Sequence, residues 1–250
     1  MIKKYIPDAI TCCNFLCGCI ATYISAKMGV NYFLFALIFI LSGAVFDFFD
    51  GMTARSLKVS SPIGKELDSL ADATTFGLAP AMMAAEYINT TTNSHYGLVM
   101  LIMAAFSIIR LAKFNLDPRQ TSSFIGLATP ANALFWASLT TSLAWNDIYQ
   151  YNIAIVLTVL MLVSSYLLIS EIPFFSLKFH NLKWADNKIR FIFIIGSLVI
   201  LCTALVAMTV NYDSQKIILP FAAICVIIVY YILLVIFDNI AAIINRNNKR

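Results

Sequence analysis

Apolar residues occupy most of this chain in long runs, with short polar connections between them. Runs long enough to cross a bilayer, about 17–25 residues each, lie at 9–27, 31–49, 66–88, 96–114, 130–146, 152–172, 191–211 and 217–240. The pattern predicts an all-α integral membrane protein with about eight transmembrane helices. The first run contains Thr11, Asn14 and Gly18, which are typical of packing or site residues, so we interpret it as a retained span and not as a signal peptide.

Three prolines indicate where two of these helices begin and where one bends. Ser61 and Pro62 predict a helix start, because serine can cap the helix and proline fits its first turn. Thr129-Pro130 predicts a similar start for the fifth helix. Pro80 lies inside the third run and predicts a kink there, which neighbouring membrane helices can accommodate.

The composition supports the membrane assignment. The chain has 250 residues, of which 60% are hydrophobic and 12% are charged, and its mean hydropathy is +0.83. Soluble domains carry about 25% charged residues, so the composition excludes a soluble globular protein. All six cysteines lie in apolar runs, which favours reduced, buried side chains over a metal site.

Lysines and arginines are distributed unevenly over the predicted connections. If the N-terminus is inside, the outer side holds only Lys27 and Lys216. The inner side then holds fifteen basic residues: Lys3, Lys4, Arg55, Lys58, Lys65, Arg110, Lys113, Arg119, Lys178, Lys183, Lys188, Arg190, Arg246, Lys249 and Arg250. The positive-inside rule therefore predicts cytoplasmic termini and a cytoplasmic connection between Asp47 and Asp72, as in a bacterial inner (plasma) membrane. The net charge of +4 is then a topology signal, and we predict no nucleic-acid partner.

A long polar connection at residues 173–190 divides the chain into two parts. It contains several basic residues and follows the sixth predicted helix. We expect residues 1–172 to form a six-helix unit. Residues 173–250 then contain this cytoplasmic loop and two C-terminal transmembrane helices.

Four aspartates lie within or beside two of the apolar runs. On helices, Asp47 and Asp50 (i, i+3) share a face, and so do Gly64, Asp68 and Asp72 (i, i+4, i+8). Charged groups in a membrane span are costly, which favours a functional site. Four opposed carboxylates would repel one another unless cations bind between them, and two divalent ions would neutralise them. Hard oxygen ligands suit Mg²⁺ or Mn²⁺.

The motif Asp50-Gly51-x2-Ala54-Arg55-x8-Gly64-x3-Asp68-x3-Asp72, preceded by Asp47, resembles the signature of the CDP-alcohol phosphatidyltransferases. The resemblance implies a six-helix catalytic bundle, to which this chain adds its C-terminal pair. It implies an integral-membrane enzyme, acting as a homodimer, in which an alcohol displaces CMP from a CDP-linked lipid. It also implies that Asp72 takes the proton from the alcohol. Asp47, Asp50 and Asp68 are then the main metal ligands, and Asp72 is a shared one.

The residues around the carboxylates predict a binding site for the CDP-diacylglycerol donor. Gly51 and Gly64 have no side chain and Ala54 has a small one, so a nucleotide can approach the helices closely. Arg55 can bind phosphate with its guanidinium group, or it can form a structural ion pair with a nearby carboxylate.

The first helix carries a second pattern, Pro7-x3-Thr11-x2-Asn14-x3-Gly18. It resembles the first helix of the same family, in which the polar side chains line the nucleotide pocket. Alternatively, Thr11 and Asn14 only form hydrogen bonds between membrane helices.

Three further stretches, at 66–80, 109–115 and 124–131, resemble the branch of the family whose members use L-serine as the acceptor. Arg110, Lys113 and Asn115 lie at the predicted cytoplasmic end of the fourth helix, where a basic group can bind the serine carboxylate. Glu66 can bind the ammonium group. Alternatively, Arg110 and Lys113 extend to the membrane surface and contribute only to the charge asymmetry.

Two other functions stay open. Within the family, the acceptor can be glycerol 3-phosphate or an inositol phosphate, which requires several basic groups around the acceptor phosphate. Outside the family, helices with buried carboxylates are compatible with a cation transporter. Transporters typically show discontinuous helices or paired repeats at a midplane site, and the sequence shows no convincing repeat.

Overall fold

The structure is a computed structural model that describes residues 5–59, 61–117, 124–175, 184–210 and 219–247. Its helices are α1 (Tyr5–Tyr23), α2 (Phe33–Leu57), α3 (Pro62–Asp72), α4 (Ala79–Thr92), α5 (Ile102–Leu116), α6 (Thr129–Trp145), α7 (Tyr151–Ile169), α8 (Trp184–Val210) and α9 (Leu219–Asn247). Short π- or 3-10-helical segments continue or join them: η2 (Ile24–Met28), η3 (Val30–Tyr32), η4 (Ala73–Leu78) and η5 (Tyr96–Leu101). Two strands, β1 (Phe124–Ile125) and β2 (Pro173–Phe174), complete the described structure.

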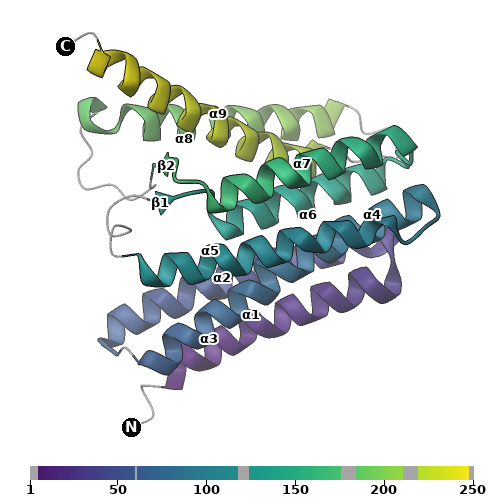
Figure 1. The fold of residues 1–250 in the computed structure, drawn as a ribbon, viewed down its shortest axis with the longest axis horizontal. Coiled ribbons are helices and arrows are strands. Elements are labelled where there is room, and N and C mark those ends of the chain that lie inside the picture. Colours follow the sequence, from purple (N-terminus) through teal and green to yellow (C-terminus); the bar gives the residue numbers. More distant parts are fainter. Residues whose placement is uncertain (1–4, 60, 118–123, 176–183, 211–218, 248–250) are drawn as a thin grey trace.

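α3, η4 and α4 form one continuous helical run, and successive runs point in opposite directions in one bundle (Figure 1). α1 begins and α9 ends at the same end of this bundle. α1 packs against α2 and α3, while α6 packs against α2, α4 and α9. The largest fully buried side chains include Trp136 on α6, Tyr87 on α4 and Phe33 on α2, so the core lies around these helices. The predicted all-α membrane fold is confirmed.

Six helical runs among the described residues are long and apolar enough to cross a membrane: Tyr5–Met28, Val30–Leu57, Tyr96–Leu116, Tyr151–Ile169, Asn187–Val206 and Ala222–Ile240. The run through α3, η4 and α4 contains the acidic residues, and α6 has only 17 residues. The membrane class is therefore confirmed, whereas the count of eight spans stays a prediction.

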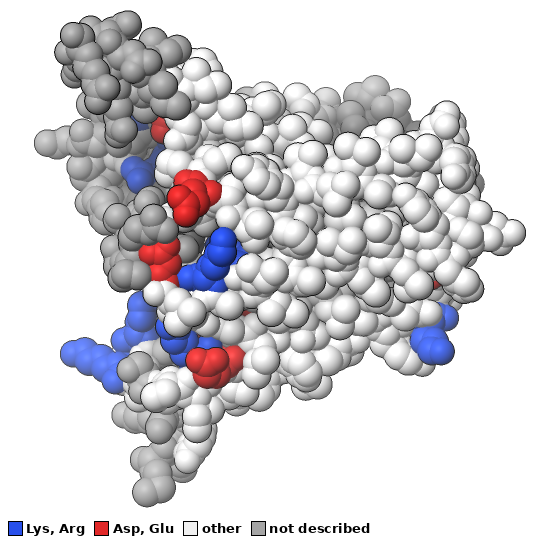
Figure 2. All heavy atoms as spheres, in the orientation of Figure 1, with Lys and Arg blue, Asp and Glu red and all other residues white. Residues whose placement is uncertain are grey.

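Charged side chains gather at one end of the bundle on the visible face, and the surface between the two ends is largely uncharged (Figure 2). This is the end at which α1 begins and α9 ends. Several residues used for the topology prediction lie outside the described part of the chain: Lys3, Lys4, Arg119, Lys178, Lys183, Lys216, Lys249 and Arg250.

The predicted helix signals had different outcomes. Ser61 caps α3, since its hydroxyl accepts a hydrogen bond of 2.9 Å from the Gly64 N–H, and Pro62 is the first helical residue. The predicted helix start at Thr129-Pro130 is confirmed, because α6 begins at Thr129, but the cap position is occupied by Ala128 and not by Thr129. Around Pro80 the chain forms the π-helical η4 just before α4, because proline cannot donate a backbone hydrogen bond and its ring displaces the preceding turn.

The C-terminal pair joins the rest of the protein mainly through α9. α8 packs on α9, and α9 packs on α6. Between α5 and α6, β1 forms an antiparallel ribbon with β2, which follows α7. This ribbon lies at the same end of the bundle as the charged side chains (Figure 1).

Candidate active site

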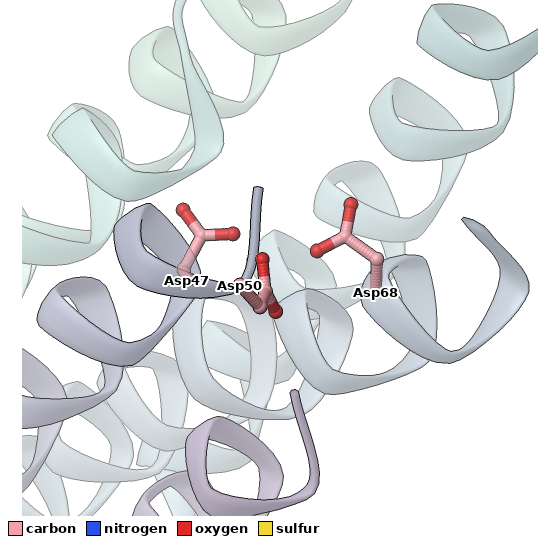
Figure 3. A group of neighbouring side chains, drawn as sticks. All are labelled: Asp47, Asp50 and Asp68. Carbon is pink, nitrogen blue, oxygen red and sulfur yellow. The ribbon is translucent and has the colours of Figure 1, made fainter. Parts of the chain in front are cut away.

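Three carboxylates from α2 and α3 meet near the charged end of the bundle. One oxygen each from Asp47, Asp50 and Asp68 lies within 4.8 Å of the others. Figure 3 shows these side chains converging between their two helices. Asp50 is buried, and Oδ1 of Asp68 is buried without a hydrogen-bond partner among the described residues. Three converging carboxylates with an unused buried oxygen fit a hard divalent cation.

Asp72 lies one helical turn beyond Asp68 and is held by the first helix. The Asn14 side-chain amide donates a hydrogen bond of 3.3 Å to Oδ1 of Asp72. In the same way, the Thr11 hydroxyl donates to Oδ2 of Asp50 at 2.6 Å. Both donors are buried, so α1 fixes one carboxylate on each of the two neighbouring helices. Thr11 and Asn14 are therefore interhelical hydrogen bonders, and a direct contact with the nucleotide stays a prediction.

Two glycines allow α1, α2 and η4 to approach closely at this point. A Cβ atom on Gly18 would lie 2.4 Å from Oγ1 of Thr75, and one on Gly43 would lie 2.5 Å from its Cγ2. Thr75 is fully buried, and its hydroxyl donates to the backbone oxygen of Asn14 at 2.9 Å. The small residues thus allow the contact that places Asn14 beside Asp72.

A cavity of about 250 Å³ opens beside the carboxylates. Its lining includes Thr11, Gly51, Ala54 and Gly64, four of the residues predicted to bind the donor, together with Asp50 and Asp68. A Cβ atom on Gly64 would lie 3.0 Å from Oδ1 of Asp8, so glycine keeps this wall open. The cavity therefore lies directly beside the carboxylates, and residues with little or no side chain form part of its wall.

Arg55 lies beside Gly51, one of the residues that line the same cavity. Its side chain is exposed, and its Nη1 lies 3.4 Å from the place that a Gly51 Cβ atom would occupy. The guanidinium also interacts electrostatically with Asp50. The structure thus places the guanidinium beside Gly51 and Asp50, and its contact with a phosphate group stays a prediction.

Arg110 forms a second centre of charge, on α5. The residue is 7% exposed, and its Nη1 donates a hydrogen bond of 3.1 Å to Oγ1 of Thr129 on α6. Its guanidinium carbon lies 5.2 Å from the centre of the Phe114 ring, and its charge interacts with Asp72. The Nε atom is buried without a hydrogen-bond partner among the described residues. Arg110 is therefore a buried cation with a free donor, on a helix that packs against η4, the segment directly after Asp72.

The other predicted acceptor residues lie in different surroundings. Lys113 and Glu66 are exposed. Glu66 is two residues from Asp68 and thus about 200° around α3 from the carboxylate face. Asn115 joins α5 to α3, because its amide donates to Ser69 Oγ at 2.6 Å and its carbonyl accepts from Lys65 Nζ at 3.0 Å. The structure therefore brings Arg110 towards Asp72 and leaves Lys113 and Glu66 at the surface.

Sequence reasoning missed two residues at the start of α6. Thr129 was interpreted as a cap, but its hydroxyl is the partner of Arg110. Asn132, one turn later, is fully buried, and both polar atoms of its side chain lack hydrogen-bond partners within the described structure. An isolated amide in an apolar helix is the signal that could have identified Asn132.

The chain is similar to proteins of one known family. The family model of the CDP-alcohol phosphatidyltransferases matches residues 4–169. A CDP-diacylglycerol–serine O-phosphatidyltransferase of Bacillus subtilis is 36% identical over 177 residues, which cover 71% of this chain and 93% of that protein. Proteins of the same name are 30% identical over 130 residues in Helicobacter pylori and 36% identical over 126 residues in Saccharomyces cerevisiae. These matches cover 51% and 48% of this chain, and 54% and 44% of the relatives. The chain is an integral-membrane enzyme that belongs to the CDP-alcohol phosphatidyltransferase family.

Proposed function

We propose that this enzyme transfers the phosphatidyl group from CDP-diacylglycerol to the hydroxyl of L-serine, which yields phosphatidylserine and CMP. Three carboxylates beside a cavity support the donor half of the reaction. The observation that carries the choice of acceptor is Arg110, a buried guanidinium with a free donor near Asp72. The names of the relatives given above specify serine as the acceptor, which supports the same choice.

The donor binds with its pyrophosphate beside Asp47, Asp50 and Asp68. Two divalent ions, Mg²⁺ or Mn²⁺, held by these carboxylates with Asp72 as a shared ligand, would stabilise negative charge on the departing CMP. Gly51, Ala54 and Gly64 leave room for the nucleotide, and Arg55 binds a phosphate oxygen. Thr11 and Asn14 keep the carboxylates oriented, and Thr11 also lines the cavity in which the nucleotide binds in this proposal.

Asp72 accepts the proton of the serine hydroxyl as its oxygen attacks the phosphate bonded to the diacylglycerol. Its place supports this role, since it lies one turn beyond Asp68 and faces the charge of Arg110. The hydrogen bond from Asn14 orients the carboxylate towards the reacting atoms. The bond from phosphorus to the CMP oxygen then breaks, and CMP leaves with the electron pair.

Arg110 binds the serine carboxylate through its paired N–H donors, which match the two oxygens of that group. Asn115 holds the end of α5 against α3 and thereby supports this position. Glu66 and Lys113 contribute less to serine binding, because both lie at the surface, where solvent weakens their charges. A phosphate-bearing acceptor would require a denser group of buried cations. Family membership leaves the transporter alternative without support.

The fifteen-to-two distribution of basic residues supports an active site and both termini on the cytoplasmic side of the inner (plasma) membrane. Soluble serine and CMP can exchange there. Residues 1–172 form the catalytic unit in this proposal, and residues 173–250 form the loop and the C-terminal pair. The homodimer implied by the family resemblance is part of the same proposal.

The decisive experiment supplies purified enzyme with CDP-diacylglycerol, Mn²⁺ or Mg²⁺, and labelled serine, glycerol 3-phosphate or inositol phosphate in separate reactions. We expect label in lipid and stoichiometric release of CMP with serine, and none after chelation of the metal. A preference for glycerol 3-phosphate would show that serine is not the acceptor, and the family assignment would still hold.

The orientation in the membrane needs a separate test. In a variant without native cysteines, a cysteine introduced at Asn93 should react with an impermeant thiol reagent outside sealed cells. A cysteine at Ser56 should not.

A further inference from the structure

We propose that the C-terminal helical pair positions the acceptor side of the active site, through Tyr231 and Asn239 on α9 and the β1–β2 ribbon. This inference rests on the proposed function, because that proposal assigns Arg110 to the acceptor. The family model ends at residue 169, so α8 and α9 lie beyond the part of the chain that defines the family. A role for the pair must therefore come from its own contacts.

The first step is the attachment of β2 to α9. The Asn239 side-chain amide donates to the backbone oxygen of Pro173 at 3.1 Å, and the Tyr231 hydroxyl donates to that of Phe175 at 2.9 Å. The Tyr231 ring also packs on Phe174 and Phe175, with centroid distances of 5.7 and 4.9 Å. One helix thus holds both ends of a two-residue strand.

The second step leads from β2 to β1 and on towards α6. Residues 124 and 125 pair with residues 174 and 173. The Gly126 N–H donates to the Ile172 oxygen, and the Leu127 N–H donates to the Leu167 oxygen, both at 2.9 Å. Gly126 has φ +76°, and a Cβ atom there would lie 2.6 Å from the Leu168 oxygen, so only glycine fits this backbone contact.

Apolar packing reinforces the same path. Leu127, Leu168, Phe174 and Val235 form one buried cluster, and each is at most 2% exposed. Val235 lies between Tyr231 and Asn239 along α9, so it shares their face of the helix. The cluster therefore joins α9, β2, the end of α7 and the segment before α6 in one packed unit.

The last step reaches the site. Thr129 follows Leu127 by two residues and begins α6, whose N-cap residue Ala128 makes no side-chain capping hydrogen bond. The start of the helix is therefore located by the ribbon and the cluster, and Thr129 in turn receives the hydrogen bond from Arg110. Tyr231 and Asn239 are positioning residues for Arg110: they touch neither substrate nor reacting atoms.

The chain provides a matched control for the test. Tyr230 lies next to Tyr231, and its hydroxyl donates to the Ile192 oxygen on α8 at 3.0 Å, away from the ribbon. Tyr231→Phe and Tyr230→Phe thus each remove one hydroxyl from the same helix. We expect Tyr231→Phe and Asn239→Leu each to raise the KM for serine about fivefold. In both variants, the KM for CDP-diacylglycerol and the kcat at saturating serine should stay within about twofold of the wild-type values. Tyr230→Phe should change neither KM value nor kcat.

Amide hydrogen exchange provides a readout that does not depend on the acceptor. In the wild-type enzyme the Gly126 and Leu127 amides should be protected, and Tyr231→Phe combined with Asn239→Leu should accelerate their exchange. Tyr230→Phe should leave it unchanged. If the wild-type enzyme does not use serine, the proposed function fails and this readout still tests the positioning role. Unchanged exchange in the double variant, or equal changes for both substrates, would overturn the inference.

Discussion

The donor and acceptor sides of this site are built in different ways. On the donor side, Asp47, Asp50 and Asp68 come from consecutive helices, and α1 fixes Asp50 through Thr11. On the acceptor side, Arg110 depends on a residue of α6, whose start is connected to α7 and α9 through the ribbon. The carboxylates of the donor side thus come from neighbouring helices and are oriented by α1, whereas the acceptor side also depends on α7 and α9, which lie much later in the chain.

This difference separates common chemistry from specificity. Activation of a pyrophosphate donor is the same for each acceptor alcohol, and a compact motif on two helices is sufficient for it. Recognition of the acceptor requires a group at a defined distance from Asp72, and here the distance depends on how α5 and α6 pack. Substitutions on the donor side should therefore abolish the reaction, whereas substitutions on the acceptor side should change which alcohol reacts and how tightly it binds.

The largest expected effect tests the donor side. Asp50→Asn and Asp68→Asn should each lower turnover by more than about a thousandfold, because each removes an anionic ligand that holds a divalent ion. Metal-dependent binding of CDP-diacylglycerol, measured by titration calorimetry, should weaken in both variants. Asp72→Asn is the matched comparison: it should bind metal and donor much better than those two variants but lose turnover, since it lacks the proton acceptor. Near-normal turnover by Asp72→Asn would remove it from that role.

The next effect tests the acceptor side. Arg110→Ala should raise the KM for serine by a factor of roughly 30 to several thousand, because it removes a buried charged partner. Binding of CDP-diacylglycerol should remain almost intact. Arg110→Lys, which keeps the charge and loses the paired donors, should have an intermediate effect. If Arg110→Ala weakens donor and serine use equally, Arg110 belongs to the nucleotide site or to folding, and the comparison between the two sides fails.

The close approach of α1 and η4, which places Asn14 beside Asp72, can be tested through stability. Gly18→Ala should lower the free energy of unfolding by about 1–3 kcal/mol, because its Cβ atom would lie 2.7 Å from the Thr75 backbone. A lower thermal unfolding midpoint in detergent would show this. Gly51→Ala is the control: its Cβ atom would meet only the flexible Arg55 side chain at 3.4 Å. That variant should unfold normally and bind the donor less tightly. Equal unfolding midpoints for Gly18→Ala and the wild type would contradict the close approach.

The sequence predicted the donor side better than the acceptor side, for a physical reason. Helical spacing alone places Asp47 with Asp50, and the structure agrees that they meet Asp68. Spacing cannot reveal that Thr129 accepts from Arg110 or that Asn132 is buried without partners, since both depend on tertiary packing. The helix ends also differ from the hydropathy prediction. α2 continues to Leu57, because helical hydrogen bonding does not stop where the apolar run does.

The smallest expected effect concerns the exposed charges. Glu66→Gln and Lys113→Gln should each change the KM for serine by less than about threefold, because water screens a charge at the surface and an exposed pair contributes at most about 1 kcal/mol. The change should shrink further as the salt concentration rises, since screening lengths fall to about 8 Å at 0.15 M. A steady-state titration of serine at two salt concentrations measures both points. An increase of a hundredfold in the Glu66→Gln variant would show that Glu66 reaches the bound serine ammonium. The acceptor site would then include the face of α3 that carries Glu66. The conclusion that this face takes no part in serine binding would be wrong.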